Sequence, residues 1–197
     1  AELLPHKEIE MAEDDSHKIL IDGKLCATTV QREQILQSAN PNSAAIDFDS
    51  INGMKTSELR SFTSGKEVIY VYHNRIDATG EALKTENSVF KAVDEAISEI
   101  FKLVKKLSKS GNVYRFLITA DHGFIYTRRP LEATDKLDTE AGKEGFADRR
   151  FIISKSNLSR LGIYAVRLSA ALNSKDDRYI NLAKGMSVFK CGGGMNY

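Results

Sequence analysis

The chain has 197 residues, enough for one well-buried domain, and its 42% hydrophobic and 28% charged residues are typical of an ordinary globular protein. Lys and Arg number 28 against 27 Asp and Glu, so no overall field favours nucleic acid or an anionic membrane, and no apolar run is long enough to span one. The acidic start lacks the apolar stretch of a signal peptide, and two distant cysteines exclude a disulfide framework, which favours a reduced, cytoplasmic protein.

Short strands and helices are predicted to alternate in the first part of the chain. An apolar run before an Asp-Gly turn predicts a strand within 17–24, and apolar residues at helical spacing predict a helix over 29–39. Apolar and acidic residues alternate over 44–50, as they do in a half-buried strand. A short helix over 57–62 then precedes a β-branched and aromatic strand over 67–73.

The clearest helix signal lies between Ser88 and Lys109, where apolar residues recur at intervals of three and four. We predict a helix over 88–108 whose inward side chains are Phe90, Ile97, Phe101 and Val104. Its last two turns are crowded with lysines, namely Lys102, Lys105, Lys106 and Lys109. These suit either a nucleic-acid patch or a solvated helix end, and we favour the latter because cations near a helix C-terminus are stabilised in any protein.

Helix 88–108 connects strand 67–73 to another predicted strand over 113–120, so the three form a βαβ unit with parallel strands. The polar segment 128–150 has little periodicity and predicts a loop. Later strands, antiparallel or mixed, are expected within 150–157, 163–172 and 179–190. The predicted fold class is therefore α/β, with a mostly parallel sheet flanked by helices.

Four potential metal ligands flank the βαβ unit. His73 and Asp77 come just after its first strand, and Asp121 and His122 come just after its second. Parallel neighbours end at the edge of the sheet where α/β proteins bind ligands, so we expect the four to converge, with ligand types that suit zinc or manganese. Other roles stay open on residue chemistry alone: a turn for Asp121-His122-Gly123, a core-edge histidine for His73 and a turn cap for Asp77.

Five segments resemble, in matching order, the PglZ family of bacterial phage-exclusion (BREX and Pgl) defence systems, which belongs to the alkaline phosphatase superfamily. They are "LLPHKEIEM", "ILIDGK", "VYHNRIDATGE", "FKAVDEAISEI" and "FLITADHGFIY". The resemblance implies an alkaline phosphatase-like core and a two-metal phosphohydrolase. It further implies that Asp121 and His122 hold one divalent cation, zinc or manganese, and that His73 and Asp77 hold the other.

The resemblance also implies that a Ser or Thr nucleophile and a metal-binding Asp precede this sequence, and that a further His follows its "GGG" segment. We therefore expect residues 1–197 to be a single partial catalytic domain, missing its N-terminal nucleophile segment and its C-terminal end. Alone, it should be inactive and bind metal weakly or not at all. Structural roles are expected for the remaining polar or reactive side chains near the motifs, which are Thr79, Thr119, Thr127, His6, His17, Cys26 and Cys191.

We expect the parent protein to be a two-metal-dependent phosphohydrolase or phosphodiesterase of a phage-defence system, acting on a phosphoester. The alternative is a metal-free α/β interaction module that docks other BREX proteins. The balanced charge does not support a nucleic-acid partner, and no membrane partner is expected. The metal content of the full-length parent separates the two readings.

Overall fold

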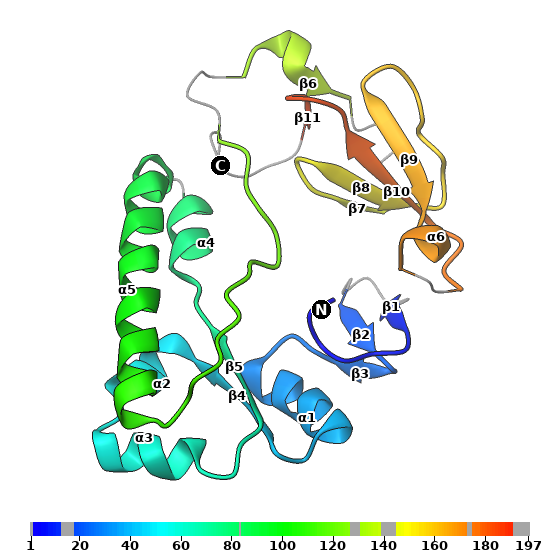
Figure 1. Ribbon diagram of the computed structural model, residues 1–197. Helices are drawn as coiled ribbons and strands as arrows, with labels where there is room; N and C mark the ends of the chain where they lie inside the picture. Colours follow the sequence, from blue (N-terminus) through cyan, green and yellow to red (C-terminus); the bar gives the residue numbers. More distant parts are fainter. Residues whose placement is uncertain are drawn as a thin grey trace. The chain divides into compact units, whose positions relative to one another are not determined.

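The computed structural model mixes helices and sheets, as predicted (Figure 1). It describes residues 2–12, 18–82, 84–126, 131–138, 145–172 and 175–190. The chain divides into two compact units, the first made of Ala1–Pro5 and Cys26–Phe124 and the second of His6–Leu25 and Ile125–Tyr197. Within the described residues no helix combines the length and the apolar composition needed to cross a membrane.

The first unit is mainly helical and contains one parallel strand pair. Its elements are α1 (Thr29–Ala39), β4 (Ser43–Asp47), α2 (Phe48–Gly53), α3 (Thr56–Thr63), β5 (Val68–Tyr72), α4 (Arg75–Gly80), η1 (Glu86–Ser88) and α5 (Val89–Ser110). The helix predicted over 29–39 is confirmed as α1, and a capping box explains its start: the Thr28 side chain accepts from the Gln31 backbone, and the Gln31 side chain accepts from the Thr28 backbone. Strands β4 and β5 run parallel and in register.

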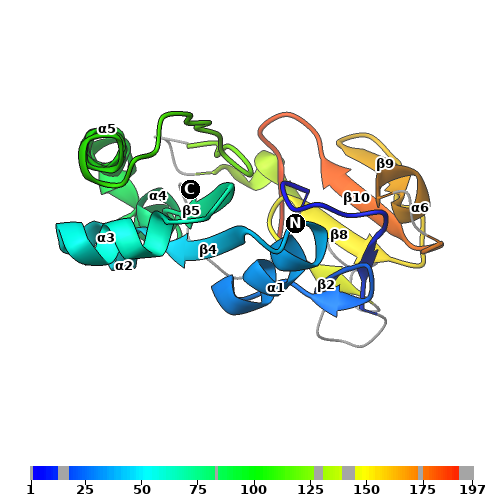
Figure 2. The same cartoon turned by 60° about the horizontal axis from the view of Figure 1, so that its bottom comes forward.

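The core of the first unit lies where α5 meets α2 and α3. Its buried side chains are Phe48, Ile51, Leu59, Leu103 and Leu107. Figure 2, which views α5 nearly end-on, shows α2 and α3 together beside it. Burying each such side chain stabilises the fold by roughly 1.5–3 kcal/mol, so this cluster fixes the helices to one another.

Two of the four lysines predicted at the solvated end of α5 have structural contacts. The Nζ atom of Lys106 donates to the backbone carbonyls of Asn52 and Met54, at 2.5 and 2.8 Å, where α2 ends. Those carbonyls lack partners within the helix, so the ammonium group caps it. Lys105 lies 4.2 Å from the centre of the Phe101 ring. Both contacts agree with a structural reading of this end of α5.

Helix α5 buries a different stripe from the predicted one. The buried side chains are Val89, Ala92, Ala96, Leu103 and Leu107. Those predicted to be inward, Phe90, Ile97 and Phe101, are 48%, 62% and 58% exposed, and Val104 is half-buried. The prediction was wrong because the helix carries two apolar stripes. Hydrophobicity favours the stripe with Phe90, Ile97 and Phe101 as the buried one. The small side chains of Ala92 and Ala96 in the other stripe instead allow a neighbour such as α4 to approach closely.

The strand predicted over 113–120 does not form among the described residues. The segment is extended and exposed, with Leu117 91% and Ile118 65% accessible. After Val113, whose amide donates to the Leu107 carbonyl, no backbone–backbone hydrogen bond joins 114–120 to any described residue. A strand is defined by its hydrogen-bonded partner, so side chains suited to a strand cannot produce one alone. The parallel pair is instead β4 with β5, connected through α2 and α3.

The second unit is built from short strands. Three form an antiparallel sheet in the order β1 (Ile9–Met11), β2 (Ile19–Ile21), β3 (Lys24–Leu25), which confirms the strand and turn predicted within 17–24. Four form an antiparallel sheet in the order β7 (Phe146–Ala147), β8 (Phe151–Ser154), β10 (Tyr179–Ala183), β9 (Ile163–Arg167). The remaining elements are η2 (Ala133–Asp135), β6 (Lys136–Leu137), α6 (Leu168–Leu172) and β11 (Val188–Phe189), with β6 and β11 parallel.

The later strands are therefore confirmed as antiparallel or mixed, and they surround a core of Ile152, Ile163, Ala183 and Phe189. The described part of 128–150 is not a plain loop, because it contains η2, β6 and β7. Instead of one mostly parallel sheet, the described residues form two antiparallel sheets and two parallel pairs.

Candidate metal centre

Asp77 belongs to the first turn of α4, the short helix that follows β5. His73 lies between the end of β5 and Asn74, which is the N-cap of α4. The Asn74 carbonyl accepts a hydrogen bond from the Ala78 amide at 3.0 Å. The negative charge of Asp77 is favoured here because a helix N-terminus carries partial positive charge. The chain thus places Asp77 one turn beyond the carboxyl end of β5.

Asp121 and His122 follow the extended segment 113–120, which returns from the C-terminal end of α5 toward α4 (Figure 1). The Asp121 carboxylate accepts from the His122 amide at 3.1 Å. Just beyond them, the Phe124 ring packs against Phe90 of α5, with ring centroids 6.1 Å apart. These contacts hold the Asp-His pair locally.

Asp77, Asp121 and His122 converge. One potential ligand atom from each lies within 4.8 Å of the other two. His122 Nε2 is 3.6 Å from a carboxylate oxygen of Asp77 and 3.9 Å from one of Asp121. Their side chains are 29% to 68% exposed, so solvent and a substrate can reach the cluster. One imidazole nitrogen and two carboxylates are ligand types that suit zinc or manganese.

The orientation of the His122 ring fits a ligand. Its Nδ1 lies 3.1 Å from the Gly123 carbonyl, so Nδ1 donates there and Nε2 is the nitrogen that faces the two carboxylates. Metal-bound histidines commonly donate their second ring nitrogen to such an acceptor. The same carbonyl, with the charges of Asp77 and Asp121, raises the pKa of His122 above its usual range against the opposing effect of desolvation.

His73, the fourth predicted ligand, has other partners. Its Nε2 lies 2.8 Å from Glu99 Oε2, and its ring meets Phe48 edge-on with centroids 4.6 Å apart. The ring is thereby fixed beside the end of β5. Because Nε2 is engaged by Glu99, Nδ1 is the nitrogen left for an ion. The three-residue cluster therefore does not include His73.

Three residues near the site, Arg75, Glu95 and Glu99, were not predicted from the sequence. Arg75 donates to both carboxylate oxygens of Glu99, at 2.9 and 2.5 Å, and to Glu95 at 3.1 Å. Hydrogen bonds from His73 and Arg75 hold the pKa of Glu99 below its usual range. Glu95 and Glu99 lie four residues apart on α5, on one helix face, and that spacing was the available signal for a bound guanidinium group.

The remaining candidates play no part in the cluster. The Thr79 hydroxyl donates to the Arg75 carbonyl, and the Thr119 hydroxyl lies 3.4 Å from the Ala120 carbonyl. Cys26 is buried, and His6 lies in the second unit. Outside the described residues lie His17, Thr127, Cys191 and the three glycines at 192–194.

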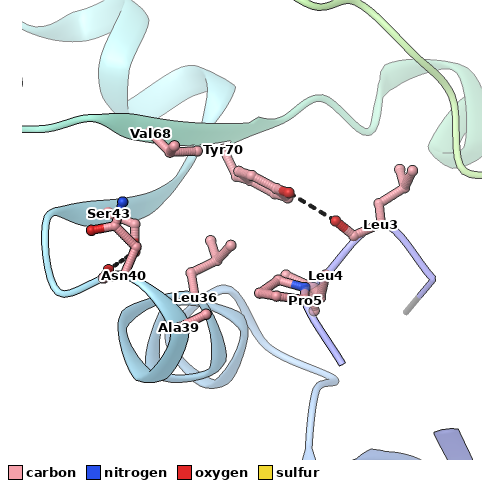
Figure 3. Close-up of a pocket in the computed structure, with 9 residues that line it drawn as sticks. All are labelled: Leu3, Leu4, Pro5, Leu36, Ala39, Asn40, Ser43, Val68 and Tyr70. Carbon is pink, nitrogen blue, oxygen red and sulfur yellow. Dashed lines mark hydrogen bonds between the residues drawn. The ribbon is translucent and has the colours of Figure 1, made fainter. Parts of the chain in front are cut away.

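A separate apolar pocket of about 370 Å³ lies in the first unit, among the N-terminal residues, α1, β4 and β5 (Figure 3). Its lining includes Ser43 and Val68, the first residues of β4 and β5, and Tyr70, which donates to the Leu3 carbonyl at 2.8 Å. It therefore lies at the amino end of the strand pair, whereas Asp77 lies beyond the carboxyl end. The described residues that line it include no His, Asp or Glu, so this pocket is not a candidate metal site.

Comparison with known proteins places the chain in an alkaline phosphatase-like class. Over residues 1–197 it matches the family described as "BREX system PglZ alkaline phosphatase-like domain". The chain belongs to the PglZ family. The match confirms the resemblance carried by the five sequence segments.

Two curated relatives cover 100% of this chain. It is 34% identical over 198 residues to "Alkaline phosphatase-like protein PglZ" of Bacillus cereus (strain H3081.97). It is 28% identical over 199 residues to "Alkaline phosphatase-like protein BrxZ" of Escherichia coli O9:H4 (strain HS). The chain spans 23% of the length of each relative. No solved structure matches it.

Proposed function

We propose that residues 1–197 are part of the catalytic domain of a divalent-metal-dependent phosphohydrolase or phosphodiesterase that acts in a bacterial phage-defence system. The observation that carries the proposal is the convergence of Asp77, Asp121 and His122 from segments far apart in the sequence. Family membership supports it, because the matched domain is described as alkaline phosphatase-like and as part of a BREX system. In this proposal a longer polypeptide completes a parallel alkaline phosphatase-like core around β4 and β5.

The chemistry of the cluster fits a divalent cation. Asp77 and Asp121 supply negative charge, and His122 presents Nε2 to them while its Nδ1 is used by the Gly123 carbonyl. A divalent cation held by these residues would act as a Lewis acid on a phosphoryl oxygen and would stabilise developing negative charge. The exposure of Asp121 and His122 leaves an open side for a phosphoester.

We propose that Asp121 and His122 hold one ion, and that His73 and Asp77 serve a second. In this proposal Asp77, whose carboxylate lies 3.6 Å from His122 Nε2, would serve both ions. His73 keeps a role in this proposal through Nδ1, since its Nε2 is bound by Glu99. The carboxylate–histidine arrangement that results is one that orients metal-ligating imidazoles in many proteins.

The test uses the full-length polypeptide that contains these residues. Its zinc and manganese content is measured by mass spectrometry, and its hydrolysis of bis-p-nitrophenyl phosphate and p-nitrophenyl phosphate is followed with and without chelator. We expect bound metal, and chelator-sensitive hydrolysis that His122→Ala abolishes. Absence of metal at equilibrium with excess zinc or manganese, together with no hydrolysis, would overturn the proposal.

A second candidate function, an interaction module that docks other defence proteins, is supported by one specific observation. Large apolar side chains are exposed on α5 and on the segment after it, namely Phe90, Ile97, Phe101, Tyr114, Leu117 and Ile118. Exposed apolar surface of this extent is a common feature of interaction sites. The metal measurement separates the candidates, because a docking module does not require an ion at Asp77, Asp121 and His122.

A further inference from the structure

We propose that Glu99 of α5 is a positioning residue for the metal centre: one carboxylate fastens both flanks of the Asn74 cap and so holds Asp77 in place. The inference rests on the proposed function. It assigns to Glu99 a role that the sequence segments carrying the family resemblance do not specify.

The contacts of Glu99 are with both neighbours of the cap. On one flank, Glu99 Oε2 lies 2.8 Å from His73 Nε2. On the other flank, Arg75 Nε lies 2.9 Å from Oε2, and the Arg75 terminal nitrogen lies 2.5 Å from Oε1. A bidentate pair of a guanidinium with a carboxylate fixes direction as well as distance. The Glu99 side chain is 25% exposed, so these bonds are partly shielded from water.

The segment that carries Asp77 needs such an anchor. Helix α4 has six residues, and helices of this length are not stable in water without tertiary contacts. Its first turn is closed by the bond from the Ala78 amide to the Asn74 carbonyl, and Asp77 lies within that turn. Fixing His73 and Arg75 therefore fixes the turn and, with it, the carboxylate that faces His122.

The anchor lies on a packed helix. Glu99 lies near the middle of α5, whose buried stripe includes Ala96 and Leu103, three residues before it and four after it. Phe48, a member of the first unit's core, packs against the His73 ring from another side at 4.6 Å. The position of Asp77 is thus tied to the core through Glu99. A ligand held in this way costs less ordering entropy when an ion binds.

The chain offers two comparison variants on the same helix. Glu95, one turn earlier, reaches Arg75 at 3.1 Å, and within the described part of the chain it forms no hydrogen bond or ion pair with His73, so it tests the Arg75 flank. Asp94 is exposed and its side chain has no hydrogen bond or ion pair with another described residue, so it controls for the loss of one negative charge on α5. Glu99→Gln, Glu95→Gln and Asp94→Asn each remove one negative charge from α5. The three variants therefore differ only in which contacts with the flanks of the Asn74 cap they remove.

The experiment measures the dissociation constant for Mn²⁺ by calorimetry, and the melting temperature of the metal-free protein, for the full-length polypeptide and each variant. We expect Glu99→Gln to weaken Mn²⁺ binding by about 10–100-fold, as outer-shell partners of metal ligands do, Glu95→Gln to weaken it less, and Asp94→Asn to leave it unchanged. The melting temperature of metal-free Glu99→Gln should match that of Asp94→Asn. If Glu99→Gln folds poorly, Glu99→Asp, which keeps the charge but shortens the reach, replaces it with the same expectation.

The outcomes are distinguishable. If the unmodified protein binds no Mn²⁺, the proposed function fails, whatever Glu99 does. If it binds Mn²⁺ and Glu99→Gln binds it equally well, the proposed function stands and the role of Glu99 is refuted. If Glu99→Gln weakens Mn²⁺ binding and also melts, without metal, at a lower temperature than Asp94→Asn, Glu99 supports the fold in general. The positioning role is then likewise refuted.

Discussion

The two sides of the candidate metal centre are built in different ways. Asp77 lies in a helix whose cap is fastened by Glu99 and tied to the buried core. Asp121 and His122 follow an extended segment in which 114–120 form no backbone–backbone hydrogen bond with the described residues. Beyond them, the ring of Phe124 pairs with that of Phe90. One side is therefore positioned by hydrogen bonds to a packed helix, whereas the other follows an extended segment without a hydrogen-bonded strand partner among the described residues.

This difference explains why the cluster is formed although the predicted sheet is not. The Asp77 side depends on contacts between residues of the described chain, namely those of Glu99 with His73 and Arg75. The other side contains the right residues in the right order but lacks a hydrogen-bonded neighbour among the described residues. A metal site needs both the ligand residues and the contacts that hold them, because ordering a mobile ligand residue costs binding free energy.

The largest expected effect tests whether the two sides act as one centre. Asp121→Asn in the full-length polypeptide should weaken Zn²⁺ or Mn²⁺ binding by at least about 100-fold, more than loss of an outer-shell partner, because it neutralises a direct ligand. Asp77→Asn, on the anchored side, should have a similar effect. Calorimetric titration measures both. A variant on either side that binds metal as tightly as the unmodified protein would show that the two sides are not one site.

The next effect compares the packed and the exposed regions directly in residues 1–197. Leu103→Ala removes a buried side chain of the first core and should lower the free energy of unfolding by about 2–5 kcal/mol. Leu117→Ala, at a site 91% exposed, should change it by less than about 0.5 kcal/mol. Urea denaturation measures both. Equal destabilisation would mean that segment 113–120 is packed and that its exposure has been misjudged.

Asp176, in the second unit, is a carboxylate held by an arginine outside the candidate metal centre, and it can be compared with Glu99. Asp176 and Arg178 form a short ion pair at 2.6 Å, and the same Arg178 nitrogen donates to the Met11 carbonyl of β1. Asp176→Asn should therefore destabilise this unit by about 1–3 kcal/mol. Hydrogen exchange at the amides of β1 and β10 measures the effect. Unchanged protection would show that the pair contributes nothing.

The pH dependence of the same pair has a defined sign. Hydrogen bonding from Arg178 lowers the pKa of Asp176 below its ordinary value of 3.8. A carboxylate with a lowered folded-state pKa contributes stability that is present above the unfolded-state value and is lost as the pH falls through the folded-state value. The contribution should therefore persist at pH 5 and disappear below 3.8. Asp176→Asn should abolish this part of the acid sensitivity, and an unchanged acid transition would contradict it.

The smallest effect concerns the weak attachment on the exposed side. The Phe90–Phe124 ring pair is worth about 0.5–1.5 kcal/mol, so Phe90→Ala should weaken metal binding by no more than about tenfold. Phe101→Ala is the matched control, since Phe101 is comparably exposed on the same helix and contacts Lys105 instead. Equal effects of the two changes on the metal dissociation constant would show that the Phe90–Phe124 pair does not help to hold Asp121 and His122.

Local patterns in the sequence predicted local structure well. The helical spacing of α1, the Asp-Gly turn between β2 and β3 and the β-branched run of β5 are local patterns, and all three predictions were confirmed. The motif residues Asp77, Asp121 and His122 were also predicted, and they lie together. Whether they bind metal stays a prediction.

What the sequence could not supply was the choice between equivalent partners. Two apolar stripes on α5 satisfy the same periodicity, and only the identity of the packed neighbours decides that Leu103 is buried and Phe101 exposed. The residues of 113–120 favour a strand, but their sequence does not determine whether a hydrogen-bonding partner strand is present. The pairing of His73 with Glu99 joins residues 26 positions apart, and no local pattern encodes it.

The proposed function depends on a divalent cation at Asp77, Asp121 and His122, with Asp77 shared with the second ion proposed at His73. Crystals of the full-length polypeptide grown with Mn²⁺ test it most directly, through anomalous scattering recorded on both sides of the manganese absorption edge. We expect an anomalous peak at bonding distance from His122 Nε2 and from carboxylate oxygens of Asp77 and Asp121, with Glu99 still bound to His73 and Arg75. A fully occupied manganese site elsewhere, with these three side chains uncoordinated, would contradict it.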